Sequence, residues 1–580
     1  PKLVPFVCLA LFTLIGCAPD EVGFLSTPAP TPTLPPLAEA VEVVDGAILV
    51  PIPIEPPSFN AYINNTGYEE LVGELVFGAL AELGPDGRYY PELALTLPTL
   101  ENGGLSEDGL TVTWQLRPGV KWSDGEPFTA RDVVFTWQAF QQSGVWAPGV
   151  DLIEAIDTPD DLTAVIHYRE FFPNYLLQFG GEGKGVFPAH ACGQPDEMLR
   201  WDCNLEPVST GPFALAEWVP GERLVFNPNP NYWIPDRPLA AQLVFVIEAE
   251  PGRRRRMLER GQAHLDLWPE EPVLGRLEEA GDVLVYATDP ARWVLRLVPN
   301  LSRYGTADPG APHPALSDLR VRQAIRQAID VPLLIEEAFQ GRAIPATSEL
   351  AASLDSACPL DGYGYNPAAA AALLDEAGWL DTDDDGLREC RGCPAGEEGE
   401  PLSLRSNTYV EFGDSLTDAH DLIAEMLAGV GIELQTEAVE GAELWGTWAD
   451  DGLELRGRFE LDLWDDGYFG FDPTDYLADY FDPRAIPTVN DPVAGLNVMR
   501  YRNPELADLF DGLRGPIPSE RRAKLLCDLA RQLERDLPVI PLLALPDYYA
   551  LNLELQGVVP HIYDAVTWNA GDWRLAPLEE

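Results

Sequence analysis

Residues 106–137, SEDGLTVTWQLRPGVKWSDGEPFTARDVVFTW, decide the fold class of this chain. Apolar and polar side chains alternate over residues 112–116, which is the period of a strand with one buried face. The Asp-Gly pair at 124–125 then predicts a turn, because both residue types tolerate a positive φ angle. Thr129 is a good N-cap for a helix, and Asp132 suits the exposed N–H groups of its first turn. We therefore expect strand, turn and capped helix, with one helix face carried by Val133, Val134 and Trp137.

The same stretch resembles a signature of the family 5 extracellular solute-binding proteins, the peptide and nickel receptors of ABC importers. In that family a pattern of the form GVKWSDG-PFTA-DV-F-W recurs, and here it is written GVKWSDGEPFTARDVVFTW. The resemblance covers about residues 42–575, nearly the whole chain. Further blocks match in the expected order: 209–213 (STGPF), 229–233 (NPNYW), 321–330 (VRQAIRQAID), 365–379 and 472–473.

The resemblance implies an α/β, two-lobed periplasmic-binding-protein fold of type II, in the large cluster C form with an extra subdomain in lobe I. The alternation of strand, helix and strand over residues 402–439 fits an α/β lobe. Matching the blocks predicts lobe I over 42–295, lobe II over 296–543 and a return to lobe I over 544–580.

Composition excludes some partners. The chain has 580 residues, which is more than one hydrophobic core usually serves. It carries 94 acidic against 38 basic residues, a formal charge of −56, which argues against nucleic acid or an anionic lipid surface as a partner. Four consecutive arginines, 253–256, begin a predicted helix, where we expect them to pair with nearby acids at the surface.

The first residues are typical of a lipoprotein. An apolar run over 3–15 ends in Leu14-Ile15-Gly16-Cys17, a lipobox, so we expect residues 1–16 to be a signal peptide and Cys17 to carry lipid. A retained membrane anchor helix is the alternative, but the run is short for a bilayer. Residues 17–41 are rich in proline and threonine and predict a tether. The protein is then expected at the outer face of the cytoplasmic membrane, periplasmic or extracellular.

The cysteines and one acidic turn raise the question of disulfides and metals. Cys192 and Cys203 predict a local disulfide in an exported protein. Cys390 and Cys393 form a CxxC without two further ligands nearby, which favours a disulfide over zinc. Whether Cys358 and Cys527 pair with each other stays open. The turn with Asp381, Asp383 and Asp385 resembles the front of a calcium loop, but Gly392 stands where the bidentate Glu is required.

Catalytic signatures are missing from the sequence. It contains no GxSxG, HExxH or GxxxxGK[ST] motif, and its six histidines include no pair spaced for a helical metal site. We therefore predict a protein that is not an enzyme and has no cofactor. A receptor of this kind needs instead two lobes, a hinge and a cleft with a few polar anchors among aromatic walls.

Candidate ligand-binding residues come mainly from the stretch 461–476, LDLWDDGYFGFDPTDY. In peptide-binding relatives, an Asp between a Trp and an acidic residue followed by Pro pairs with the peptide's α-ammonium group. Trp464 and Asp472-Pro473 match that pattern with longer spacing, so Asp465 or Asp466 is expected to take this role. Tyr468 and the neighbouring Phe469 and Phe471 either stack on a ligand, sugar rings included, or pack beneath the cleft.

The resemblance also implies ligand contacts outside this stretch. Arg405 and Asn407 correspond to positions that face the other end of the ligand, and an arginine there suits a carboxylate. Asn60 and Thr210 are candidates in lobe I by their position in matched loops.

These features together predict a monomeric, lipid-anchored substrate-binding protein of an ABC importer. It captures oligopeptides between its lobes and delivers them to permease and ATPase subunits. The alternatives are a receptor for oligosaccharides or a cationic metabolite, a secreted hydrolase, and a surface sensor or adhesin with the same fold.

Overall fold

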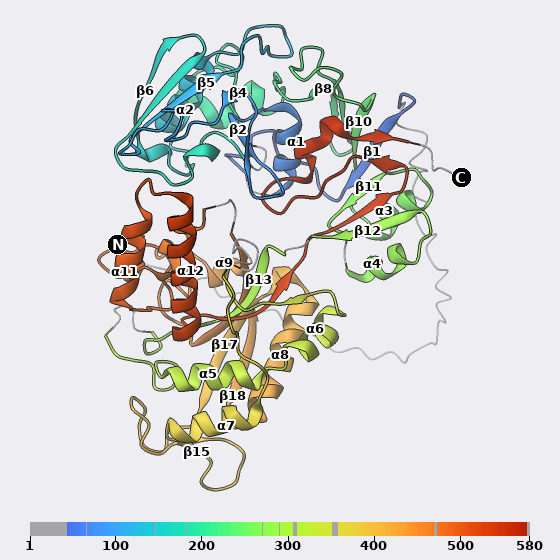
Figure 1. The fold of residues 1–580 in the computed structure, drawn as a ribbon. Helices are drawn as coiled ribbons and strands as arrows, with labels where there is room; N and C mark the ends of the chain where they lie inside the picture. Colours follow the sequence, from blue (N-terminus) through green and yellow to red (C-terminus); the bar gives the residue numbers. More distant parts are fainter. Residues whose placement is uncertain are drawn as a thin grey trace, which may run out of the picture. The chain divides into compact units, whose positions relative to one another are not determined.

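The computed structural model describes residues 43–576, except residues 65, 146, 182–183, 270, 289–290, 306–309, 351–357 and 469–471 (Figure 1). The predicted signal peptide, Cys17 and the tether lie outside the described residues. From Val44 onward the chain forms one contact unit. In the part of the chain that the structure describes, no helix has both the length and the apolar character to cross a membrane.

The stretch 106–137 folds as its pattern predicts. Strand β5 (Thr111–Leu116) buries Val112, Trp114 and Leu116, and Gly125 in the turn has a φ of 98°. Helix α2 (Ala130–Ser143) begins after Thr129, whose N–H donates to the Asp132 carboxylate over 2.8 Å. The helix face differs in detail from the prediction, because Val134 and Trp137 are only half-buried. The buried residues are Ala130, Asp132, Val133, Phe135, Thr136, Ala139 and Phe140.

Two four-stranded sheets form in the first half of the chain. One has the order β1-β10-β9-β8, in which only the β1–β10 pair is parallel. The other has the antiparallel order β4-β5-β7-β6, and β2 pairs with β3 in a hairpin. The bounds are β1 (Ala47–Ile52), β2 (Ala81–Leu83), β3 (Tyr89–Pro91), β4 (Ala94–Thr96), β6 (Ile153–Asp160), β7 (Thr163–Tyr168), β8 (Phe213–Val219), β9 (Arg223–Pro228) and β10 (Gln242–Ile247).

A three-stranded sheet joins segments that are far apart in the sequence. Its central strand β21 (Tyr548–Asn552) pairs with β11 (Leu265–Leu267) and with β12 (Val283–Ala287), both antiparallel. The last residues of the chain thus return to the region that precedes residue 290. The short strands β22 (Leu555–Gln556) and β23 (Arg574–Leu575) also pair there.

The sheet that carries the candidate site has the order β14-β20-β13-β19. Its central strand β13 pairs antiparallel with both neighbours, and β17 and β18 form a parallel pair beside it. The bounds are β13 (Trp293–Pro299), β14 (Ile344–Pro345), β15 (Trp379–Leu380), β16 (Glu389–Cys390), β17 (Ser403–Tyr409), β18 (Glu433–Val439), β19 (Leu461–Gly467) and β20 (Ile540–Leu545).

The helices pack on these sheets mainly in the second half of the chain. Helices α5 and α7 lie side by side, and so do α11 and α12 (Figure 1). The bounds are α1 (Tyr68–Val76), α3 (Pro251–Glu259), α4 (Glu271–Glu278), α5 (Leu319–Ala328), α6 (Val331–Phe339), α7 (Pro367–Glu376), α8 (Asp414–Ala428), α9 (Gly441–Leu444), α10 (Thr474–Phe481), α11 (Pro504–Leu513) and α12 (Ser519–Asp536).

The hydrophobic cores follow this division of the chain. One core draws on residues between 48 and 267 and again between 549 and 573. Two others draw only on residues between 295 and 543. The lobe boundaries at residues 295 and 543 stay a prediction. The residues of these cores fall on either side of those boundaries, which is a physical reason to retain them.

Three disulfides link cysteines within the described residues. Cys192–Cys203 and Cys390–Cys393 close short loops, with Cα–Cα distances of 5.0 Å and 5.4 Å. Cys358–Cys527, which the sequence left open, joins residues 169 positions apart.

Candidate functional site

A cavity of about 320 Å³ opens where strand β19 ends. Strand β19 supplies Trp464, Asp465 and Asp466 in direct succession, at the end where its run of buried residues gives way to the half-buried Asp465 and Asp466. Helix α10 (Thr474–Phe481) contributes Tyr480. We call this the aromatic cavity; it is completed by Trp445, Glu454, Leu496 and Val498.

Arg296 of β13 is the charged centre behind the aromatic cavity. Its side chain is fully buried and donates to Asp466 Oδ2 over 2.8 Å and to Tyr476 Oη over 3.0 Å, and it also pairs with Glu349. Its guanidinium lies 4.2 Å from the centre of the Trp464 ring and 4.9 Å from that of Tyr480. Buried charges need such partners, so Asp466 is part of an internal network and not a free anchor for a ligand.

Asp465 differs from Asp466 in having no ion pair within the described residues, which is also true of Glu454 in the same cavity. Asp465 accepts a hydrogen bond from the hydroxyl of Tyr409. Burial raises the pKa of Asp465, although the bond from Tyr409 opposes this shift. An ammonium group placed beside it would restore the charged form, since an opposite charge favours ionisation.

Two further acids are buried at this site, Glu454 in the cavity lining and Asp462 on strand β19. Glu454 accepts from Trp464 Nε1 over 2.7 Å, which fixes the indole ring. Asp462 accepts from the backbone N–H of Asn407 over 3.0 Å and from its amide over 2.8 Å. Burial raises the pKa of Asp462 to about 7, and burial together with the charge of Asp462 raises that of Glu454 well above its usual value.

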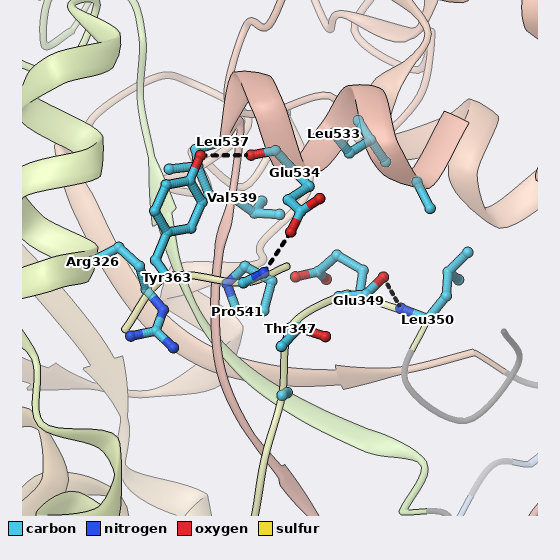
Figure 2. Close-up of a pocket in the computed structure, with 14 residues that line it drawn as sticks. Arg326, Thr347, Glu349, Leu350, Tyr363, Leu533, Glu534, Leu537, Val539 and Pro541 are labelled. Carbon is cyan, nitrogen blue, oxygen red and sulfur yellow. Dashed lines mark hydrogen bonds between the residues drawn. The ribbon is translucent and has the colours of Figure 1, made fainter. Parts of the chain in front are cut away.

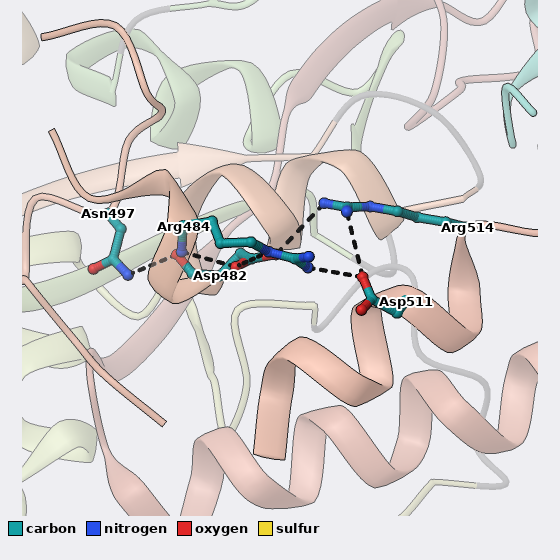
Figure 3. A network of polar contacts seen from close by, with 5 residues as sticks. All are labelled: Asp482, Arg484, Asn497, Asp511 and Arg514. Atoms are coloured by element: carbon teal, nitrogen blue, oxygen red, sulfur yellow. Dashed lines mark hydrogen bonds and ion pairs between the residues drawn. The ribbon is translucent and has the colours of Figure 1, made fainter. Parts of the chain in front are cut away.

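The wall formed by Leu496 and Val498 is held by a polar network (Figure 3). The buried amide of Asn497 donates to Asp482 O over 3.1 Å and to Tyr501 O over 3.0 Å. The Asp482 carboxylate in turn pairs with Arg484 over 2.6 Å, and Arg484 reaches Asp511 over 2.9 Å. This network fixes the loop between α10 and α11, and so the shape of the cavity on that side.

The family assignment rests on a match over residues 88–488 to the model of the bacterial extracellular solute-binding proteins, family 5. The match covers more than half of the chain. The chain belongs to this family.

Several proteins with known names or structures are similar to this chain. Protein XP55 of Streptomyces lividans is 27% identical over 82% of this chain and 80% of that protein. A putative ABC transporter peptide-binding protein of Brucella ovis is 30% identical, but over 47% of this chain and 50% of its own length. The solved structure of the oligopeptide-binding protein AppA of Bacillus subtilis, in complex with a nonapeptide, superposes with a TM-score of 0.66. That match is 20% identical and covers 92% of this chain and 99% of AppA.

This family 5 solute-binding protein therefore has the mixed α/β, two-lobed periplasmic-binding-protein fold that the sequence predicted. Its homologues are solute-binding proteins and not enzymes, and the family is described as extracellular.

The predicted ligand residues divide into three groups. Trp464, Asp465 and Asp466 come together in the aromatic cavity. Arg405 and Asn407 line a different cavity of about 440 Å³ between β17, β18 and Tyr304, where the Arg405 guanidinium lies 4.7 Å from the Tyr304 ring. The other candidates are buried, and Phe469 and Phe471 lie outside the described residues.

Asn60, Thr210 and Tyr468 have structural partners that the sequence did not indicate. Asn60 is fully buried and donates to Asn204 Oδ1 over 3.0 Å, and Thr210 Oγ1, equally buried, accepts from Gly78 N over 3.0 Å. Tyr468 is 8% exposed and its hydroxyl donates to Asp472 O. These three side chains hold loops together, and their role as ligand contacts stays a prediction.

An exposed acidic turn and a small pocket offer no ligand site. Asp381, Asp383 and Asp385 are exposed; Asp381 accepts a hydrogen bond from Gly386 N and Asp385 accepts one from Leu387 N, as in an ordinary acidic turn. The pocket in Figure 2 holds about 30 Å³, room for about one water molecule. Its wall is closed by Glu534, which accepts from Gly362 N over 2.6 Å. We assign no ligand to either place.

Sequence reasoning missed Arg296, Trp445, Glu454 and Tyr480. One signal was available for Arg296, because it is the only charged residue in the apolar strand WVLRLVP. A charge at such a position requires a buried partner. The other three come from loops and helices whose approach to β19 depends on tertiary packing.

Proposed function

We propose that this family 5 solute-binding protein is the substrate-binding component of an ABC importer for oligopeptides. The peptide binds in the aromatic cavity and is delivered to a membrane permease that ATPase subunits drive. The names of the Brucella ovis and Bacillus subtilis relatives support a peptide ligand. Lipid on Cys17 holds the protein, as a monomer, at the outer face of the cytoplasmic membrane.

The observation that carries the proposal is the position of Asp465. It stands at the end of β19 between Trp464 and the ion-paired Asp466, and it faces a cavity with three aromatic rings. A free peptide amino terminus would pair with Asp465, and an apolar side chain would lie against Trp445, whose own side chain is 42% exposed. Charge-assisted hydrogen bonds and aromatic contacts together are a usual basis for such recognition.

The test compares the wild type with Asp465→Asn by isothermal titration calorimetry, after a thermal-shift screen of peptides and oligosaccharides. We expect peptides with a free amino terminus to lose at least about tenfold in affinity, because a charge-assisted bond contributes about 1.5–3 kcal/mol. N-acetylated peptides should bind weakly and equally to both. Asp418→Asn, an exposed acid on α8, is the charge-matched control.

Other outcomes would favour the alternatives. If an oligosaccharide or a cationic metabolite stabilised the protein and no peptide did, that compound class would take the place of peptides as the proposed ligand. Turnover of a peptide or glycan, followed by mass spectrometry, would indicate a hydrolase. Neighbouring genes for two permeases and two ATPases would favour transport over a sensor or adhesin role.

The anchor is tested separately. Metabolic labelling with a radioactive fatty acid should mark the wild type, and Cys17→Ser should abolish the label and release the protein from the membrane fraction. A labelled Cys17→Ser variant would contradict the proposed lipid site.

A further inference from the structure

Three acids from distant parts of the chain converge away from the aromatic cavity. Glu74 lies on α1, Glu82 on β2, and Asp564 in the loop after β22. One carboxylate oxygen from each lies within 4.8 Å of the other two. Ca²⁺ holds oxygen ligands at about 2.3–2.6 Å, so two of its ligands lie at most about 5 Å apart. The spacing is therefore that of oxygens around one cation.

Two side-chain hydrogen bonds to backbone carbonyls hold this arrangement independently of the acids. Thr567 Oγ1 donates to Leu71 O over 2.8 Å and ties the C-terminal segment to α1. His561 Nε2 lies 2.6 Å from Leu83 O and ties the same segment to the end of β2. Because both bonds flank Asp564 in the sequence, its carboxylate is positioned between Glu74 and Glu82 by the fold.

The buried carboxylate of Asp564 is the second indication of a bound cation. Its side chain is buried, with 5% exposed, and Oδ1 accepts from Ala565 N over 2.7 Å. Oδ2 is buried and accepts no hydrogen bond from an N–H or hydroxyl group within the described residues, and the Glu82 carboxyl lies within hydrogen-bonding reach of the Asp564 carboxyl. An unsatisfied buried carboxylate oxygen is costly, so it points to a ligand that supplies positive charge.

A fourth acid strengthens the local negative charge. Glu92 accepts from Ala79 N over 2.6 Å, and burial raises its pKa to about 8. Burial and the charges of Asp564, Glu74 and Glu92 all raise the pKa of Glu82. Lys184 pairs with a different acid: its Nζ lies 3.9 Å from Glu70 Oε1, and Glu70 precedes Glu74 by one turn of α1. A cation bound among the carboxylates would lower the cost of keeping them ionised.

We propose that Glu74, Glu82 and Asp564 bind a hard divalent cation, with Ca²⁺ as the best fit. The donors are carboxylate oxygens only, which hard cations prefer over zinc or copper. Ca²⁺ also accepts irregular geometry, which suits ligands from a helix, a strand and a loop. The bound ion joins α1, β2 and the returning C-terminal segment, and so stabilises the region to which that segment returns.

The experiment uses the full protein passed over a chelating resin, so that no soluble chelator remains. CaCl₂ and MgCl₂ are titrated calorimetrically, and thermal unfolding is followed with and without each salt. We expect one Ca²⁺ per chain, a higher melting temperature, and weaker binding of Mg²⁺. Glu82→Gln and Asp564→Asn should each weaken Ca²⁺ binding at least tenfold, with folding checked by circular dichroism. Asp383→Asn, in the exposed acidic turn, is the matched control and should bind as the wild type does.

Two results would overturn the proposal. One is a wild type whose melting temperature and heat signal do not respond to millimolar Ca²⁺, which needs no variant to fold. In that case Glu82 and Asp564 share a proton, and Glu82→Gln should raise the melting temperature at neutral pH without any metal. The other is loss of binding in Asp383→Asn with binding kept in Asp564→Asn, which would place the ion in the exposed turn.

Discussion

Arg296 lies directly opposite Trp464 in the pairing of β13 with β19, and its guanidinium stands 4.2 Å from the centre of the indole ring. The same guanidinium neutralises Asp466, so the strand pair and the cavity share one charged centre. A buried arginine in this position determines both the stability of the sheet and which carboxylate remains for a ligand.

The first prediction concerns removal of that charge. Arg296→Met leaves Glu349 and Asp466 without their partner, and we expect a loss of about 3–5 kcal/mol in the free energy of unfolding, measured by urea denaturation at pH 7. The double variant Arg296→Met with Glu349→Gln should recover part of the lost free energy of unfolding, because it leaves one buried carboxylate fewer without a partner. Arg458→Met is the control, because Arg458 is 43% exposed and its pair with Asp451 is worth about 1 kcal/mol or less. Equal losses in the two single variants would contradict a structural role for Arg296.

The second prediction concerns the pH dependence of stability. Because burial raises the pKa of Asp462 to about 7, the folded protein holds a proton that the unfolded chain releases near pH 4. Asp462 therefore lowers the free energy of unfolding progressively as the pH rises from about 4 to about 7. Below and above this range its contribution does not change with pH. Asp462→Asn should make this slope of urea unfolding free energy against pH shallower, whereas the exposed Asp418→Asn should leave it unchanged; Glu454 and Glu92, whose pKa values are also raised, contribute the rest. An unchanged slope in Asp462→Asn would mean that Asp462 is ionised throughout.

The sequence predicted the elements that depend on local pattern. The strand, turn and capped helix of residues 106–137 follow from alternation, an Asp-Gly pair and an N-cap, and all three are observed. The run Arg253–Arg256 forms part of helix α3 and pairs with acids as expected. Arg254 is nevertheless buried against Asp266, so the helix is not wholly at the surface.

The site could be predicted only in part. Trp464, Asp465 and Asp466 are adjacent in the sequence, so one motif finds all three. The ion pair of Asp466 with Arg296 depends on strand pairing across 170 positions, which no local pattern encodes. Asn60 and Thr210 occupy matched loops, but loop position does not determine whether a side chain points to solvent or to the core.

The third prediction concerns the network of Figure 3. Although burial alone would raise it, the pKa of Asp482 is lowered by hydrogen bonds from Arg484 and by the charges of Arg484 and Arg514. Its contribution to stability is therefore full above about pH 4 and is lost as the pH falls through the lowered pKa. Thermal unfolding between pH 2.5 and 6 should show a shallower acid decline for Asp482→Asn than for the wild type. A decline as steep as that of the wild type would assign acid sensitivity to other groups.

The fourth prediction compares two disulfides that differ in loop length. Cys358–Cys527 closes a loop of 169 residues and Cys192–Cys203 one of 11. If the disulfides act mainly by restricting the unfolded chain, removing the long-loop disulfide should lower the free energy of unfolding by about 5 kcal/mol. Removing the short-loop disulfide should lower it by about 3 kcal/mol. The variants Cys358→Ala with Cys527→Ala and Cys192→Ala with Cys203→Ala are compared by urea unfolding. The difference should vanish when all proteins are unfolded in a reducing agent, because the wild type then loses the same constraints. A larger loss for the short-loop variant would show instead that the Cys192–Cys203 bond stabilises the native packing around buried Trp201 and not only the unfolded chain.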